Sequence, residues 1–250
     1  MRILFITLAI ILSFCTKLSA EFKLSFYEIS LKEGLSQTSV HDICRDYKGI
    51  LWIGTNFGLN RYDGDEMRQY FNIKTDSTSI SGNQIHFIKE DHSKNLWIGT
   101  NHSVVRYNRE KDNFERPDEL KRVIIKSCFQ TDDRMIFFTT DRMISFYYKD
   151  QTFRTTFFQP NIRTIPLSVK IAALDENTLL IGTRWRGIFR CDIKTGQLFQ
   201  EKFHPSSQIT DLCIDKNGII WLSSYGDGLF AYSKKGELIR HFTTENSELC

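Results

Sequence analysis

Two carboxylates are the strongest candidates for catalytic chemistry in this chain of 250 residues. Asp42 and Asp211 come near the starts of segments that we expect to be inner strands of repeated sheets. Acids that reach into a shared channel from such strands can act as general acid and base on a glycosidic bond. The adjacent pairs Glu90-Asp91 and Asp132-Asp133 fall in predicted turns, and Gly226-Asp227-Gly228 is a turn rather than a nucleotide loop. We therefore predict no catalytic residue, and a lyase or glycosidase stays as an alternative.

The sequence offers weaker candidates for metal-binding and redox chemistry than for acid–base catalysis. The six histidines are scattered, and His86 and His92 have no cysteine or acidic partner at metal spacing. The run Asp63-Gly64-Asp65-Glu66 lacks the remaining oxygen ligands of a calcium loop and reads as a hairpin turn. The cysteines form no dense pattern, so no disulfide framework is evident. We expect no metal and no cofactor.

A third set of candidates could bind a sugar. Aromatic, arginine and asparagine side chains suit sugar rings and uronic acids, and here they occupy loops that follow equivalent Thr or Ser residues. The residues are Asn56, Phe57, Asn101, His102, Arg184, Trp185, Arg186 and Tyr225. We predict that they gather on one face of the molecule as an oligosaccharide site. The alternative is that they cap that face or contact a neighbouring domain.

These loops are equivalent because one segment recurs along the chain. Leu51-Trp52-Ile53-Gly54-Thr55 returns as Leu96-Trp97-Ile98-Gly99-Thr100, and weaker copies surround Phe137, Leu180 and Trp221. With these five residues in the tryptophan position, the spacings are 45, 40, 43 and 41 residues. A period of about 40–45 residues is typical of four short strands per β-propeller blade.

Each copy reads as four strands separated by turns, so we predict an all-β β-propeller of four-stranded blades. The five blades cover about residues 34–75, 79–116, 123–158, 168–203 and 207–242. Packing and turn formation are the roles expected for Trp52, Gly54, Asp63, Gly64, Trp97, Gly99, Gly182 and Trp221. We expect an incomplete ring of a larger propeller, and a closed five-bladed ring is the alternative.

The N-terminal segment reads as an export signal. Residues 1–20 have a basic start, an apolar core and a plausible cleavage site. Residues 21–33 follow as a strand that could close the ring. We expect a periplasmic or otherwise exported protein, membrane-anchored if the signal is not cleaved. Without Arg2 and Lys17 the chain has 31 basic and 30 acidic residues, a balance that argues against a nucleic-acid partner.

The first copy also carries a family resemblance. The pattern from Gly34-Leu35-Ser36 through Leu51-Trp52-Ile53-Gly54-Thr55 to Asp63-Gly64 resembles the two-component regulator propeller repeat. The resemblance is specific in the first two copies, fair in the fifth and weak in the third and fourth.

That resemblance implies the periplasmic sensor region of a hybrid two-component system of the Bacteroidota type. Such proteins sense glycan breakdown products and relay the signal to a histidine kinase. The implied partners are an oligosaccharide, the remaining sensor and kinase domains, and a second copy in the intact receptor. The chain stops after five repeats, so we expect a fragment that is not itself an enzyme. A stand-alone secreted propeller that binds protein or glycan is the alternative.

Overall fold

The computed structural model describes residues 26–125, 127–158, 169–204 and 208–247. The expected signal segment and residues 21–25 lie outside this range. Within it, the protein consists of five four-stranded antiparallel sheets in chain order. The helices found in the described residues are short 3-10 turns, η2 (Leu31–Glu33) and η3 (Asp118–Leu120). The predicted all-β propeller architecture is confirmed.

The sheets are numbered along the chain. Sheet 1 contains β1 (Val40–Arg45), β2 (Leu51–Thr55), β3 (Leu59–Tyr62) and β4 (Met67–Tyr70). Sheet 2 contains β5 (Ile85–Glu90), β6 (Leu96–Thr100), β7 (Val104–Asn108) and β8 (Asn113–Glu115). Sheet 3 contains β9 (Ser127–Gln130), β10 (Arg134–Phe138), β11 (Arg142–Tyr147) and β12 (Thr152–Phe157). Sheet 4 contains β13 (Val169–Ala173), β14 (Thr178–Thr183), β15 (Gly187–Asp192) and β16 (Leu198–Gln200). Sheet 5 contains β17 (Ile209–Ile214), β18 (Ile220–Ser224), β19 (Gly228–Tyr232) and β20 (Leu238–Phe242).

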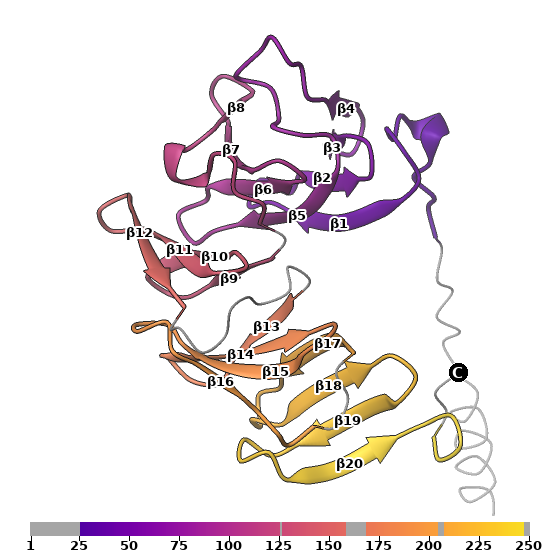
Figure 1. The fold of residues 1–250 in the computed structure, drawn as a ribbon. Helices are drawn as coiled ribbons and strands as arrows, with labels where there is room; N and C mark the ends of the chain where they lie inside the picture. The colour runs from indigo at the N-terminus through magenta and orange to yellow at the C-terminus, as the bar shows by residue number, and fades with distance from the viewer. Residues whose placement is uncertain (1–25, 126, 159–168, 205–207, 248–250) are drawn as a thin grey trace, which may run out of the picture.

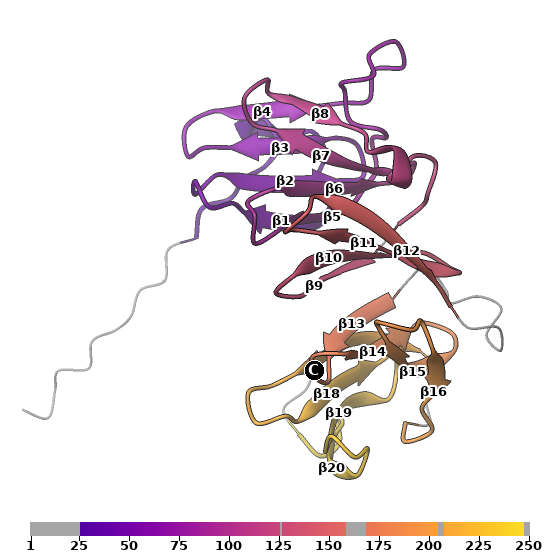
Figure 2. The same cartoon turned by 90° about the vertical axis from the view of Figure 1, so that its left-hand side faces the viewer.

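The five sheets follow one another around an open arc (Figure 1). The first strand of each sheet lies on the inner side of the arc and the fourth lies toward the outside. The view in Figure 2 shows sheets 1 and 2 stacked face to face. Apolar side chains fill each interface between consecutive sheets, so the core is a series of layers rather than one centre.

Trp52 and Trp97 fill two of these layers and are fully buried. Each points toward the next sheet: Trp52 packs with Leu96 and Ile98 of sheet 2, and Trp97 packs with side chains of sheet 3. Trp221, in sheet 5, is only partly buried, because no described sheet follows it. Coverage by the next sheet therefore decides how deeply each tryptophan is buried.

The assignment of Phe137 to the tryptophan position is wrong by one residue. Ile136 pairs with Ser145 as Trp52 pairs with Arg61, and it faces sheet 4. Phe137 faces back toward sheet 2, where its ring lies edge-on to Trp97 at 5.2 Å. A one-residue shift moves every side chain of a strand to the other face of the sheet.

Each tryptophan of the repeat donates its indole N–H to an aspartate six residues earlier. The Nε1 to Oδ2 distances are 3.0 Å for Trp52–Asp46, 2.8 Å for Trp97–Asp91 and 3.0 Å for Trp221–Asp215. The same carboxylates accept backbone N–H groups of the turn between the first two strands. One carboxylate thus fixes the turn and satisfies a buried donor.

Two further contacts fix the geometry of the repeat. Ser36 and Ser81, each 16 residues before a tryptophan, bond through Oγ to Thr55 Oγ1 at 3.1 Å and to Thr100 Oγ1 at 2.8 Å. Gly54 leaves room for the next sheet: a Cβ there would lie 2.5 Å from Cγ2 of Ile85. The space beside Gly54 is therefore filled by a side chain of sheet 2.

An ion-pair network joins sheets 1 and 2. Arg109 contacts Asp46 at 2.6 Å and Glu90 at 2.8 Å, and Glu90 accepts the backbone N–H of Tyr47. Burial alone would raise the pKa of the Asp46 carboxyl, but hydrogen bonds from Arg109 and Trp52 outweigh burial and hold that pKa below its usual value.

The segment before sheet 1 differs from the expected strand over residues 21–33. In its described part, residues 26–30 have no regular secondary structure and η2 follows. Leu35 is buried, and Ser36 accepts and donates hydrogen bonds with Asn60 of β3, so the segment is held against sheet 1. Among the described residues, the helices are too short to cross a membrane.

We expect an aspartate that bonds to a tryptophan to stabilise the fold more than an aspartate that only caps a turn. Asp91→Ala leaves the buried Trp97 N–H unpaired, and we expect a loss of about 2–4 kcal/mol in the free energy of unfolding. Asp175→Ala is the matched control: Asp175 caps the equivalent turn of sheet 4 through Asn177 N but has no tryptophan partner. We expect it to cost about 1 kcal/mol or less. Urea unfolding measures both, and equal losses would contradict the assignment.

Stability should also depend on the charge of Asp46. Because the folded-state pKa lies below the unfolded value of about 3.9, the stabilisation is complete above that pH and is lost as pH falls through the folded-state value. Asp46→Asn should cost about 2 kcal/mol at pH 6, and the difference from wild type should shrink toward pH 3. Asp65→Asn, in an exposed turn, is the control. A difference that does not change with pH would rule out this role.

Candidate functional site

The loops between the second and third strands hold all the predicted ligand-binding residues. Every sheet has the same antiparallel strand order, so these loops emerge on one side of the arc. Three aromatic side chains on them are exposed although they are large: Phe57 by 55%, Trp185 by 61% and Tyr225 by 73%. We call this side of the arc the loop face.

Hydrogen bonds join the loops of sheets 1 and 2. Asn56 Oδ1 lies 2.6 Å from His41 Nε2 and accepts from Gln84 Nε2 at 3.0 Å. Asn101 N in turn donates to the backbone oxygen of Gln84 at 3.0 Å. Asn56 and Asn101 are thereby brought together through the segment that leads into sheet 2. The side-chain oxygen of Asn56 is therefore engaged with two groups of the protein itself.

The loops of sheets 4 and 5 are more open. The guanidinium of Arg184 lies over the Trp185 ring, 5.3 Å from its centroid, and Gln200 Nε2 bonds to the backbone oxygen of Arg186. The backbone of Tyr225 is held by a bond from its N–H to the oxygen of Gln208. The rings of Trp185 and Tyr225 are thus displayed to solvent on a fixed backbone.

A cavity of about 480 Å³ opens beside the Asn101-His102 loop. Its other walls include Arg116, Lys121 and Arg122, which lie in the connection between sheets 2 and 3. Sequence reasoning missed these three residues, because it searched only positions that recur in the repeat. A cluster of basic residues in a connection between blades was the available signal.

Each of the two candidate catalytic acids accepts a backbone N–H group. Asp42 sits at a bulge of β1, where its carboxylate accepts the backbone N–H of Ile88 in sheet 2 at 2.7 Å. Asp211 sits at the matching bulge of β17 and accepts the N–H of Leu212. Asp42 therefore ties the inner strands of two neighbouring sheets together.

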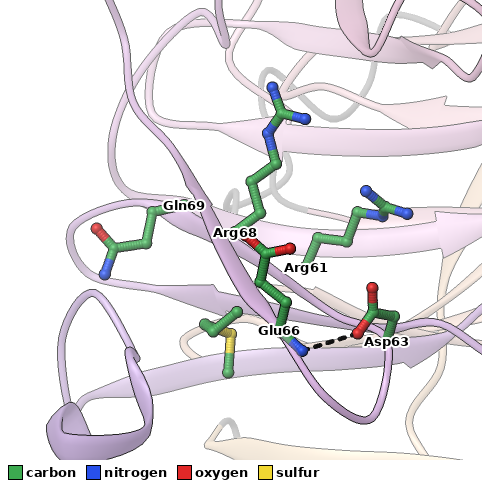
Figure 3. Close-up of a pocket in the computed structure, with 6 residues that line it drawn as sticks. Arg61, Asp63, Glu66, Arg68 and Gln69 are labelled. Atoms are coloured by element: carbon green, nitrogen blue, oxygen red, sulfur yellow. Dashed lines mark hydrogen bonds between the residues drawn. The ribbon is translucent and has the colours of Figure 1, made fainter.

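A second hollow, of about 380 Å³, lies at the outer edge of sheet 1 (Figure 3). Asp63 caps the turn there by accepting the backbone N–H groups of Glu66 and Asp65, and these hydrogen bonds lower its pKa. Arg68 forms an ion pair with Asp112. The charges of this hollow are largely balanced by the protein's own groups.

No group of three metal-ligating side chains is close enough to hold an ion among the residues for which the structure gives a placement.

The repeated sheets and the open arc define a β-propeller region. The family model "Two component regulator propeller" matches residues 34–57, 79–102 and 204–226, which surround the first two strands of sheets 1, 2 and 5. The repeats that form sheets 1, 2 and 5 therefore match the two-component regulator propeller model.

Three known proteins share local sequence or fold with this chain. "Histidine kinase P4" of Formosa agariphila is 55% identical over 49 residues, a stretch that covers 20% of this chain and 4% of that protein. The extracellular domain of a putative hybrid two component system from B. thetaiotaomicron superposes with a TM-score of 0.70 at 21% identity, over 88% of this chain and 32% of that chain. Virginiamycin B lyase from Staphylococcus aureus gives a TM-score of 0.61 at 15% identity, over 83% and 71%. The chain spans about a third of the B. thetaiotaomicron chain, and both superpositions establish a shared fold.

The role assigned to Asp42 can be separated from catalysis. Asp42→Ala removes an acceptor between two sheets, so we expect it to cost about 1–2 kcal/mol in the free energy of unfolding. Asp211→Ala should cost less than about 0.5 kcal/mol, because that side chain is 68% exposed, accepts the next residue's N–H and otherwise forms an exposed ion pair with Lys170 at 3.9 Å. We expect neither the wild type nor either variant to cleave any substrate in a panel of polysaccharides. Cleavage that is abolished by Asp42→Asn would restore the enzyme interpretation.

Proposed function

We propose that this chain is a recognition module of an exported two-component sensor. Its support is the family model that matches three of its repeats, together with the similarity of a 49-residue stretch to a histidine kinase. The remaining sensor domains and the kinase would belong to the parent protein, where a second copy would form the signalling dimer. The chain itself would bind and relay, without catalysis.

The ligand that fits the loop face best is an oligosaccharide. The observation that carries this proposal is the exposure of Phe57, Trp185 and Tyr225 on loops at equivalent positions. Exposed aromatic rings on a rigid backbone can stack on sugar rings with little loss of conformational entropy. Asparagine and arginine side chains beside them supply hydrogen bonds to hydroxyl groups.

A relay would follow from the layered core. Because each sheet contacts only its neighbours, a ligand that bridges loops of several sheets would change the energy of the interfaces between them. Such a change could pass along the arc to the domains that follow. A stand-alone secreted binding propeller would use the same face but would have no domain to receive the signal.

Binding should depend on the exposed rings of the loop face. Titration calorimetry of the full chain with neutral and acidic oligosaccharides should detect binding that Trp185→Ala or Tyr225→Ala weakens about tenfold or more. Phe199→Ala is the matched control, because Phe199 is 57% exposed but lies on β16 at the outside of the same sheet as Trp185. Unchanged affinity in both loop variants, or equal loss in the control, would exclude the loop face as the site.

A further inference from the structure

The cavity beside the Asn101-His102 loop differs from the rest of the loop face in its charge. Three cationic side chains line it together with His102, and the described residues of its wall include no carboxylate. The lining residues are Ser81, Asn101, His102, Ser103, Arg116, Lys121, Arg122 and Ile124. Since the whole chain carries a net charge of only +3, this concentration is local. Its volume of about 480 Å³ lies within the range of about 300–1,000 Å³ for small-molecule sites.

The backbone that carries the cations is anchored on both sides. Leu120 and Ile125 are fully buried in the layer between sheets 2 and 3, so the short stretch between them is forced outward. Arg122 has a positive φ of 57°, a conformation that is unfavourable for a residue with a side chain. Strained backbone of this kind persists where the surrounding structure holds it. Lys121 and Arg122 are therefore presented at the cavity from a fixed position.

Only part of this cationic charge is balanced within the protein. Lys121 contacts Asp118, whose carboxylate is 85% exposed. Arg116 donates hydrogen bonds from Nη2 to the backbone oxygens of Ser79 and Ile80. Arg122 is exposed, and among the described residues no ion pair engages it. The hollow of Figure 3 differs in this respect, because the carboxylates of Asp63 and Glu66 line it together with its arginines.

Two of the lining residues carry a buried polar atom with unused hydrogen-bonding capacity. Asn101 Oδ1 and Arg116 Nε are buried, and neither has a hydrogen-bond partner in the described part of the chain. One is an acceptor and the other a donor. Buried polar atoms without partners are uncommon and costly, which makes them informative here.

Gly82 permits this arrangement. A Cβ at position 82 would lie 2.3 Å from Asn101 Oδ1 and 2.6 Å from His102 Nδ1. The corresponding position before sheet 1 is Gln37, directly after Ser36, so the repeat itself does not require glycine. The glycine is needed only where Asn101 and His102 fold inward to form a wall of the cavity.

We infer that this cavity binds the anionic group of an acidic sugar, a carboxylate or a sulfate ester, with Arg122 and Lys121 pairing with the charge. Ser81, Ser103 and His102 then face the hydroxyl groups, and Ile124 offers an apolar contact for the ring. The inference deepens the proposed function, on which it rests, by naming the ligand class at sheet 2. The residues come from two elements, the β6–β7 loop and the connection to sheet 3, that only the fold brings together.

The test uses three matched trisaccharides titrated into the full chain: a neutral galactose trimer, its sulfate ester and trigalacturonate. We expect an acidic trimer to bind at least about tenfold more tightly than the neutral one, because an ion pair with Arg122 is added. The preference should weaken between 50 and 300 mM NaCl, since salt screens charge pairs. Whichever acidic trimer binds more tightly identifies carboxylate or sulfate as the recognised group.

The variants separate charge from fold. Arg122→Gln and Lys121→Gln should each remove most of the preference for the acidic trimer, and Arg122→Lys should keep most of it. Arg154→Gln, which removes one exposed positive charge from β12, should change nothing. Unchanged melting temperatures show that each variant is folded. Equal affinity for the neutral and acidic trimers, or full binding by the Arg122→Gln/Lys121→Gln double variant, would overturn the inference.

The outcomes distinguish this inference from the proposed function. Binding of all three trimers with equal affinity, lost in Trp185→Ala, would leave the loop face as an oligosaccharide site and remove the anionic subsite. Acidic binding that depends on Arg122 but not on Trp185 would keep the subsite and reject the wider site. Binding of none would reject both.

Discussion

A buried indole N–H must find a hydrogen-bond acceptor, and this requirement organises the repeat. In sheets 1, 2 and 5 the acceptor is an aspartate six residues before the tryptophan, at the start of the turn that joins the first two strands. The carboxylate closes the turn, orients the tryptophan and fixes the register of the hairpin. Where the tryptophan is missing, as in sheets 3 and 4, the aspartate six residues earlier is missing too: Gln130 lies six before Ile136, and Leu174 six before Leu180.

The layered core follows from that register. With the tryptophan fixed, alternate residues of the second strand point to the two neighbouring sheets, and a glycine leaves space for the next inner strand. The loops between the second and third strands then emerge at one side, where their side chains are free to differ. The same constraint that makes the repeats alike therefore produces a face on which Phe57, His102, Trp185 and Tyr225 can diverge.

The recurrence of Trp, Gly and Thr at a fixed period predicted the all-β propeller, because each of these residues has a packing role that the structure repeats. The serine 16 residues before the tryptophan was also visible in the sequence, and its bond to the threonine explains the spacing. Sheet 3 shows where such reasoning fails. Phe137 resembles tryptophan in chemistry, but Thr139 occupies the position of Thr55, so Ile136 fills the tryptophan position.

The cationic cavity could not have been predicted from the repeat. Arg116, Lys121 and Arg122 belong to a connection, and only the burial of Leu120 and Ile125 brings them beside a loop of sheet 2. Likewise, the role of Asp42 depends on a backbone N–H contributed by another sheet. Both features depend on contacts between sheets, and a periodic sequence pattern does not show which residues of different sheets are in contact.

Hydrogen–deuterium exchange of the full chain, measured with and without saturating trigalacturonate, locates the ligand on the arc. We expect slower exchange in the loop face and in the connection over residues 116–125, with the outer strands unchanged. Slower exchange confined to the hollow at the β3–β4 edge, or to the inner strands around Asp42, would place the ligand elsewhere and contradict the account.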